Sequence, residues 1–391
     1  MAPVIVLDQY YLAITFLISL GLQGALFAIC FGFQTDKLTD LGGSINFFII
    51  ALFTLLAGDT FYARNIVASY VNCTSTSYSR ARSLMISDID SDPLTFDSVF
   101  VMVWSFRLGA FLFYRVMKTG KDGRFDEMRS AVTKLGGFFL FQLFWCWTVS
   151  LPLTILNSPA VSDPARGGGN VKFGTASDII GIILWVVGYS LEVMADSQKF
   201  RFKFNNPQKG AINDKGVWGW SRHPNYAGEI ILWWGMYALC IAPATHNAAS
   251  PGGRKALIAS VVGPIFISRK SSQVLAPPRR QADPLNDVIR HTSVLLYFVS
   301  GLPQSEKPTQ KKYYLMSHGL DPESGDKWAE YKAYLNRTSI LFPLPPAVYR
   351  PLPKWVKQYV LFDAPMYRFD EHEEGKEAVE EQRKNRAEND D

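Results

Sequence analysis

The residues best suited to chemistry stand together in the segment SRHPNYAGEIILWW, residues 221–234. Its first half carries five polar or ionisable side chains: Arg222, His223, Asn225, Tyr226 and Glu229. An apolar run follows them at once. Ionisable groups at the mouth of a membrane helix are energetically costly, so their presence there indicates a functional site. Guanidinium, imidazole, amide and carboxyl groups can bind a charged ligand and transfer protons. The segment therefore predicts a binding site where a bilayer meets water.

The element that must position these groups is a helix that begins at Pro224. Proline is tolerated in the first helical turn, where its missing N–H needs no partner. Residues four apart lie on one helix face, so Asn225 and Glu229 share one face. Arg222 and Tyr226 share a neighbouring face.

A second polar helix end precedes this one in the sequence. Glu192 and Asp196 share a face at the end of an apolar run, and Lys199 and Lys203 continue it for about two turns. Lysine and arginine suit the phosphates of a dinucleotide, and aspartate, asparagine and glutamate suit its ribose hydroxyls and carboxamide. A basic connector, 199–222, joins the two ends, so we expect them to lie side by side and wall a pocket.

Each of these residues also has a structural interpretation. Asp196, Lys199 and Lys203 are what the positive-inside rule predicts at the cytoplasmic end of any span. Glu229 fits a carboxylate that is hydrogen-bonded between helices, and His223 fits a helix cap.

Composition places these elements in a membrane. The 391 residues are 48% hydrophobic, 14% aromatic and 19% charged, which is typical of an integral membrane protein. A span needs about 20 mostly apolar residues. Six runs qualify, and a seventh is interrupted: 11–33, 41–58, 97–117, 135–156, 178–195, 226–245, and 256–268 with 293–302. The expected fold is an all-α transmembrane bundle of about seven spans.

Lysine and arginine set the expected orientation. They gather in 118–134, in 199–222 and after residue 302, which places these segments in the cytoplasm. The N-terminus is then lumenal and the C-terminus cytoplasmic. The glycosylation pattern Asn72-Cys73-Thr74 falls in an opposing loop.

Three regions of different composition are expected. Residues 1–345 form the transmembrane domain, and residues 346–391 a charged cytoplasmic tail. The polar, Pro-rich stretch 269–292 interrupts the last span, and Arg269-Lys270-Ser271 is what a translated splice donor encodes, so a retained intron would explain it.

Prolines between 340 and 354 prevent a regular helix and predict an irregular lid or anchor against the membrane face. No nucleic-acid module is visible, and the four cysteines have no metal-ligand spacing.

Several motifs together resemble those of a known family. They are SRHPNYxGE followed by two tryptophans, Glu192–Gln198 with Arg201–Lys203, Trp104–Gly109, Phe141–Pro152, Val299–Pro303 with Glu306-Lys307, and Ala329–Tyr331 with Arg337–Ser339. The set, spread over about 36–345, is similar to the steroid 5-alpha-reductase-like membrane proteins, in the branch described only as a domain of unknown function.

The resemblance implies a helical enzyme of the endoplasmic reticulum membrane that uses NADPH to reduce a carbon–carbon double bond in a steroid-like or other lipid. It maps cofactor contacts onto Asp196, Lys203, Asn225 and Glu229, with Arg222, His223 and Tyr226 beside them. No obligate protein partner is implied. With Glu192 and Lys199 from the helix face, the predicted cofactor set is Glu192, Asp196, Lys199, Lys203, Arg222, His223 and Asn225.

The substrate half departs from the family pattern. Where the steroid reductases carry a tyrosine in the third span this chain has Trp104, and Leu302 and Glu306 replace an arginine and a histidine. Hydride transfer leaves charge on the substrate oxygen, which something must polarise or protonate. Tyr226 and Glu229 are the predicted catalytic residues.

Two other functions remain open. Membrane methyltransferases that use S-adenosylmethionine, such as those acting on isoprenylcysteine or phospholipid amines, carry a similar RHPxYxG turn. A binding or scaffold protein that has lost its chemistry would also explain Trp104 and Leu302. The block from Glu192 to Lys203, with Asn225 and Glu229, favours the reductase.

Overall fold

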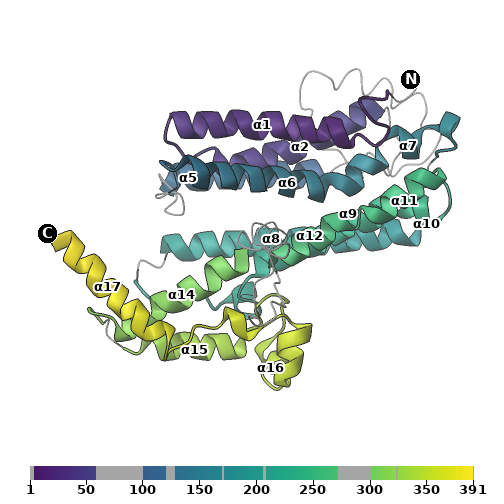
Figure 1. Cartoon of the computed structure of the whole chain (residues 1–391). Coiled ribbons are helices and arrows are strands. Elements are labelled where there is room, and N and C mark those ends of the chain that lie inside the picture. The colour runs from purple at the N-terminus through teal and green to yellow at the C-terminus, as the bar shows by residue number, and fades with distance from the viewer. Residues whose placement is uncertain are drawn as a thin grey trace, which may run out of the picture. The chain divides into compact units, whose positions relative to one another are not determined.

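A computed structural model describes residues 4–58, 100–119, 128–169, 171–205, 208–271, 301–322 and 325–390 (Figure 1). Within these ranges the regular elements are helices, and the only β pairing is two isolated bridges. The all-α prediction is therefore confirmed for this part of the chain. The structure divides into two compact units, Met1–Val186 with Leu232–Ile267 and Val187–Ile231 with Ser268–Asp391. We call them unit 1 and unit 2.

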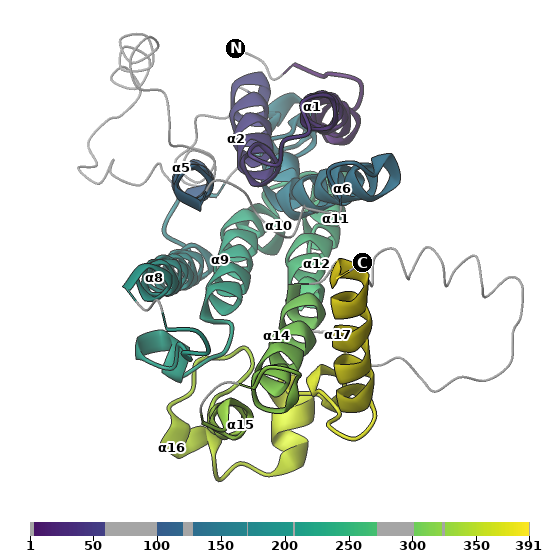
Figure 2. The same ribbon diagram turned by 90° about the vertical axis from the view of Figure 1, so that its left-hand side faces the viewer.

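Unit 1 is built from long apolar helices joined by several short ones. They are α1 (Leu12–Gly32), α2 (Thr39–Gly58), α5 (Phe100–Thr119), α6 (Val132–Leu156), α7 (Pro159–Ser162), η2 (Pro164–Arg166), α10 (Ala242–Thr245) and α11 (Pro251–Ala259). The first part of α8 (Ala176–Asn205), the last part of α9 (Pro224–Cys240) and most of α12 (Val262–Ser271) complete it. Helix α1 packs against α6, and α2 packs against both α5 and α6; Figure 2 views α1, α2 and α6 together.

Four helical segments are long and apolar enough to cross a membrane: Leu12–Gly32, Thr39–Gly58, Val132–Ser162 and Ala176–Asn205. They indicate a multi-pass membrane protein. The other expected spans, 97–117 and 226–245, coincide with α5 and with α9 and α10, but α9 has only 17 residues and α5 carries Arg107, Arg115 and Lys118. The count of seven spans and the lumenal N-terminus stay predictions. Most of the insertion 269–292, the half-span 293–300 and the glycosylation pattern lie outside the described residues.

Uncharged polar contacts join the helices of unit 1. Asn46 Nδ2 donates to Ser19 Oγ at 3.1 Å, and Asn157 Nδ2 donates to Thr54 Oγ1 at 3.2 Å. Such contacts hold membrane helices together because lipid offers no hydrogen bonds. The core beside them is aromatic: Trp104 is fully buried, and its ring lies 5.2 Å from the rings of Phe47 and Trp233. At the position of the expected family tyrosine, Trp104 therefore acts in packing.

Paired glycines let α8 and α9 approach each other closely. In unit 1, a Cβ on Gly181 would meet Gly235 O at 2.8 Å, and one on Gly235 would meet Gly181 O at 2.7 Å. In unit 2, a Cβ on Gly228 would meet Gly188 O at 2.6 Å. Any larger residue would force the backbones apart, so small residues are required at these contacts.

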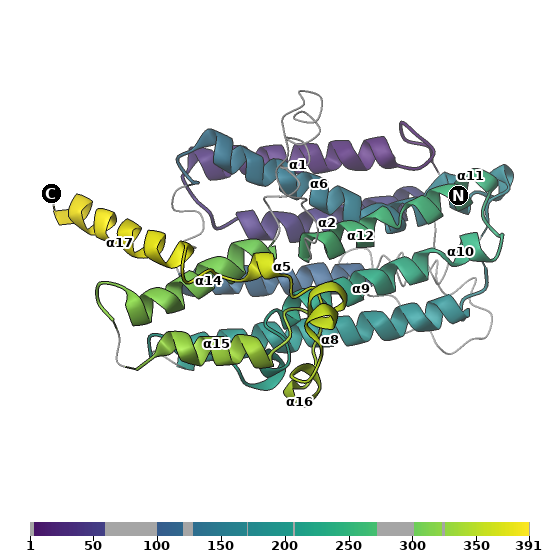
Figure 3. The same ribbon diagram turned by 60° about the horizontal axis from the view of Figure 1, so that its bottom comes forward.

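Unit 2 contains shorter and more polar helices. They are the last part of α8, η3 (Gly216–Gly219), the start of α9, α14 (Gly301–His318), α15 (Lys327–Arg337), α16 (Pro346–Tyr349), η4 (Val356–Val360), η5 (Pro365–Tyr367) and α17 (Glu374–Asp390). Figure 3 shows α14 and α15 side by side. Their shared core includes Trp328 and Phe369 and a stacked pair, Tyr313 and Tyr331, with ring centroids 4.1 Å apart.

The segment after residue 345 is packed into unit 2 over much of its length. Tyr349, Tyr367 and Asp363 are all buried, although the sequence placed them in a charged tail. Only α17, from Glu374 onward, has the dense charge expected of a solvated helix. It is held to α14 by an ion pair of 2.5 Å between Lys307 and Glu374. Unit 2 extends across residue 345, and the domain boundary expected there stays a prediction.

Candidate functional site

A buried ion cluster lies at the entrance to α9 in unit 2. Arg222 donates from Nη1 to Glu306 Oε2 and from Nη2 to Asp363 Oδ1, both at 2.7 Å. The side chains of all three residues are at most 2% exposed. Short contacts of this kind between charged groups are among the strongest hydrogen bonds in proteins. We call Arg222, Glu306 and Asp363 the buried ion cluster.

Glu306, on α14, connects the cluster to the predicted histidine. Its Oε1 lies 2.6 Å from His223 Nε2, and its Oε2 accepts a second bond from Gln310 Nε2 at 3.2 Å. Gln310 also donates to Tyr367 O and accepts from Phe369 N. Because a carboxylate can only accept, the Nε2 of His223 carries the hydrogen. The ring of His223 is therefore fixed in orientation, and it stacks on Tyr226 with centroids 5.3 Å apart.

Asp363 connects the cluster to the C-terminal segment. Its Oδ2 accepts hydrogen bonds from the Tyr349 hydroxyl and from Arg368 Nη2, the latter at 3.0 Å. The Arg368 side chain is 40% exposed, and it supplies a second positive charge to Asp363 from the protein surface. Two buried carboxylates then face two guanidinium groups, which balances the charge of this part of the cluster.

The pKa directions follow from these contacts. Burial by itself lowers the pKa of Arg222, but the carboxylates of Glu306 and Asp363 outweigh it and raise that pKa. Burial by itself raises the pKa values of Glu306 and Asp363, but Arg222 outweighs it and both are lowered. These three groups are therefore charged at neutral pH. Burial lowers the pKa of His223 despite its bond to Glu306, and the charge of nearby Lys199 lowers it further.

The turn before α9 is also held by backbone contacts. Arg222 N donates to Ser339 O at 2.8 Å, and Ser221 Oγ donates to Leu341 O at 2.7 Å. Ser221 Oγ also accepts from His223 N, which orders the chain just before Pro224 begins the helix, as expected. Two motifs that carry the family resemblance, SRHP and RTS, are thus joined in the structure.

The two polar helix ends predicted from the sequence do meet. A Cβ on Gly228 of α9 would lie 2.7 Å from Glu192 N on α8, so the two helices touch at this level. Further along α8, Trp218 Nε1 donates to Ala195 O at 3.0 Å, and Lys199 Nζ lies 5.2 Å from the Trp218 ring.

The predicted site residues differ in accessibility. Glu192 and Arg222 are buried, whereas Lys199 and Lys203 are exposed. The remaining five are partly buried: Asp196, His223, Asn225, Tyr226 and Glu229. The structure brings Arg222, His223 and Tyr226 into one cluster and places Glu192 beside the start of α9.

Sequence reasoning missed the cluster's two carboxylates. In the sequence, Glu306 belongs to one of the resembling motifs and replaces a histidine, and Asp363 falls in the predicted tail, so neither is predicted as a site residue. No short-range pattern marks them, because they lie 84 and 141 residues from Arg222. In the described part of the chain, no group of three or more His, Cys, Asp or Glu residues is placed to hold a metal ion.

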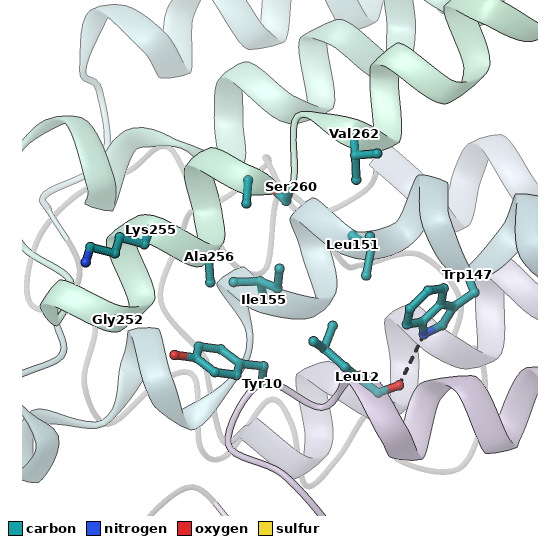
Figure 4. Close-up of a pocket in the computed structure, with 11 residues that line it drawn as sticks. Tyr10, Leu12, Trp147, Leu151, Ile155, Gly252, Lys255, Ala256, Ser260 and Val262 are labelled. Atoms are coloured by element: carbon teal, nitrogen blue, oxygen red, sulfur yellow. Dashed lines mark hydrogen bonds between the residues drawn. The ribbon is translucent and has the colours of Figure 1, made fainter. Parts of the chain in front are cut away.

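A separate apolar cavity of about 510 Å³ lies in unit 1 (Figure 4). Its walls come from α1, α6, α11 and α12, with Trp147, Leu151 and Ile155 on one side and Ala256 on another. Trp147 Nε1 donates to Leu12 O at 3.2 Å, and Lys255 is the single charged residue in the lining. None of the predicted site residues lines this cavity.

Comparison with known proteins gives one match to a family model and no activity. Residues 84–271 match the model of a family described as a protein of unknown function (DUF1295), which includes α8 and α9 but neither Glu306 nor Asp363. An uncharacterized protein of Schizosaccharomyces pombe is 28% identical over 160 residues, in an alignment that covers 34% of this chain and 44% of that protein. The chain therefore spans less than half of that relative's length. No solved structure matches the chain.

Proposed function

We propose that this protein is a reductase of the endoplasmic reticulum membrane that uses NADPH to reduce a carbon–carbon double bond in a steroid-like or other lipid. The observation that carries the proposal is the contact of α8 and α9 at Gly188, Glu192 and Gly228. The contact joins a helix that carries acidic and basic residues to the start of a helix that carries an amide and a carboxylate, and these groups together are the combination expected around a dinucleotide.

The donor set fits the cofactor. Lys199 and Lys203 are exposed and four residues apart, so their ammonium groups lie on one helix face and are of the type that binds phosphates. Asp196 and Asn225 are partly buried and suit ribose hydroxyls and a carboxamide. When bound, NADPH supplies the hydride. Tyr226 and Glu229 lie near the start of α9 and remain the proposed proton-handling residues.

Arg222 and His223 take a positioning role in this proposal, although the sequence indicated direct cofactor contacts. The guanidinium already meets two carboxylates, and the imidazole is bound to Glu306. Both side chains hold α14 and the C-terminal segment against the entrance to α9. They thereby fix the turn that presents Asn225 and Tyr226.

Cofactor binding tests the proposal directly. The purified full chain is titrated with NADPH and, separately, with S-adenosylmethionine, and binding is followed by calorimetry. We expect saturable NADPH binding that weakens by at least about tenfold in Asn225→Ala and Lys203→Ala, since a charged hydrogen bond contributes about 1.5–3 kcal/mol. Lys376→Ala, an exposed lysine of α17, is the matched control and should bind like the wild type.

The other outcomes identify the alternatives. Binding of S-adenosylmethionine without NADPH would replace the proposal by a lipid methyltransferase. Binding of neither would favour a scaffold protein. NADPH binding that is unchanged in Asn225→Ala and Lys203→Ala would move the cofactor away from these helix ends.

A further inference from the structure

A group of large apolar side chains is exposed on the segment between α16 and η5 in unit 2. Trp355 is 61% exposed, Tyr359 is 67% and Val360 is 53%, and Val348 of α16 is half exposed. Single exposed apolar residues are ordinary, whereas several large ones on one short segment indicate an interaction surface. We call these four residues the aromatic surface.

The charge around the aromatic surface has one sign. Residues 346–362 contain three basic side chains, Arg350, Lys354 and Lys357, and no acidic one. Arg350 and Lys354 are exposed, whereas Lys357 donates to Arg350 O and lies over the Tyr349 ring. Tryptophan and tyrosine next to lysine and arginine are the composition of segments that rest in the headgroup layer of a membrane.

Hydrogen bonds within unit 2 connect the start of the segment that carries the aromatic surface to the apolar run of α8. Leu344 N donates to Trp220 O at 3.1 Å, just before α16 begins. Trp218, two residues earlier, donates to Ala195 O. Ala195 is the last residue of the apolar run of α8, a helix long and apolar enough to cross a membrane. The residues just before the aromatic surface are therefore bonded to the turn that contacts the end of this apolar run.

Buried hydrogen bonds also hold the backbone of this segment, so the positions of its exposed side chains are fixed. Tyr349 is fully buried and donates to Asp363, and Asp363 N donates to Lys357 O at 2.8 Å. Leu361 N donates to Val356 O at 3.0 Å and closes the turn that carries Tyr359 and Val360.

We propose that Val348, Trp355, Tyr359 and Val360 insert into the headgroup layer of the bilayer that the chain spans, with Arg350 and Lys354 bound to anionic lipid headgroups. The partner is the lipid surface and not another protein, because basic and aromatic groups alternate beside the end of a membrane helix. This binding surface does not depend on the proposed enzyme activity.

Photo-crosslinking in nanodiscs tests the proposal with the full chain. The variants Trp355→p-benzoylphenylalanine and Tyr359→p-benzoylphenylalanine keep an aromatic group at the surface, and Glu377→p-benzoylphenylalanine on exposed α17 is the control. On illumination we expect phospholipid adducts at 355 and 359 and only background at 377. Absence of lipid adducts at 355 and 359, or crosslinks there to protein instead, would overturn the proposal.

The charge component has its own measurement. In nanodiscs of phosphatidylcholine with phosphatidylserine, adducts at Trp355 should favour phosphatidylserine. Each of Arg350→Gln and Lys354→Gln should lower that preference by about fivefold, the equivalent of one basic residue near an anionic surface. Lys376→Gln on α17 should leave it unchanged. An unchanged preference in both surface variants would remove the anionic headgroup from the proposal.

Discussion

Unit 1 and unit 2 bury polar groups in opposite ways. In unit 1 fully buried contacts between helices join uncharged side chains, as in the bond from Asn46 to Ser19, and the ion pair of Asp36 with Arg129 keeps its arginine 20% exposed. In unit 2 the deepest contacts join full charges, with Arg222 between Glu306 and Asp363. Isolated charges are costly in hydrocarbon, whereas a folded domain in water can bury a charge if its partners are complete. The uncharged contacts of unit 1 suit a set of membrane helices, and the fully paired charges of unit 2 suit a domain in water.

The two units should also differ in how well they tolerate the loss of one hydrogen-bonded or ion-paired side chain. Removing one uncharged group leaves a small polar atom unsatisfied. Removing one charge from the buried ion cluster leaves another charge buried without compensation. Unit 2 should therefore respond more strongly to single changes, to pH and to truncation.

The largest effect is expected from Arg222→Ala. It leaves Glu306 and Asp363 buried without their main partner, which should lower the free energy of unfolding by about 3–5 kcal/mol. Thermal unfolding in detergent, with proteolysis of residues 346–369 as a local readout, measures it. Arg368→Ala removes a 40% exposed partner of the same Asp363 and should cost at most about 1 kcal/mol. Equal stability of the two variants would contradict the central role of Arg222.

Acid should loosen unit 2 before unit 1. The folded-state pKa values of His223, Glu306 and Asp363 are all lowered, so their contribution to stability is full above the ordinary values of 6.5, 4.5 and 3.8. It is lost as the pH falls through the lowered values, His223 first and the carboxylates later. Hydrogen exchange of 346–369, corrected for its intrinsic pH dependence, should rise below about pH 6.5.

Two controls define that pH response. Peptides of α1 and α6 should keep their protection, because the buried side chains of these two helices are uncharged. His223→Gln should remove the first phase and keep the second. Parallel loss of protection in both units would show that the difference in buried charge does not govern acid stability.

The smallest effect is expected from Asn46→Leu in unit 1. It removes the bond to Ser19 at similar volume, and interhelical hydrogen bonds of this kind contribute on average about 0.6 kcal/mol and at most about 1.7. A double-mutant cycle with Ser19→Ala isolates the interaction. A coupling as large as the effect of Arg222→Ala would remove the distinction between the units.

Helix positions could be predicted from the sequence, because apolar composition alone marks a span. The expected runs 11–33 and 41–58 match Leu12–Gly32 and Thr39–Gly58 closely. Helix α8 extends ten residues beyond the expected end at 195, since hydropathy marks where a span leaves the membrane and not where a helix stops.

The cluster around the predicted site could not be found in this way. The types and spacing of Arg222 and His223 predict a site there, and in the structure both side chains contact Glu306. Their partner Glu306 comes from a distant helix, and Asp363 from an irregular segment between prolines. Ion pairs across such distances depend on tertiary packing, which leaves no local periodicity.

The sequence order of the cluster has a consequence for biosynthesis. Asp363 is translated 141 residues after Arg222, which corresponds to about 7–30 s at ordinary elongation rates. During that interval Arg222 lacks Asp363 as a counterion, so the buried ion cluster cannot be completed until the C-terminal segment has been made. A premature stop codon between Glu306 and Asp363 would leave this charge permanently short of one counterion. We expect such a product to be recognised by quality control and degraded, even though all of its helices in unit 1 are intact.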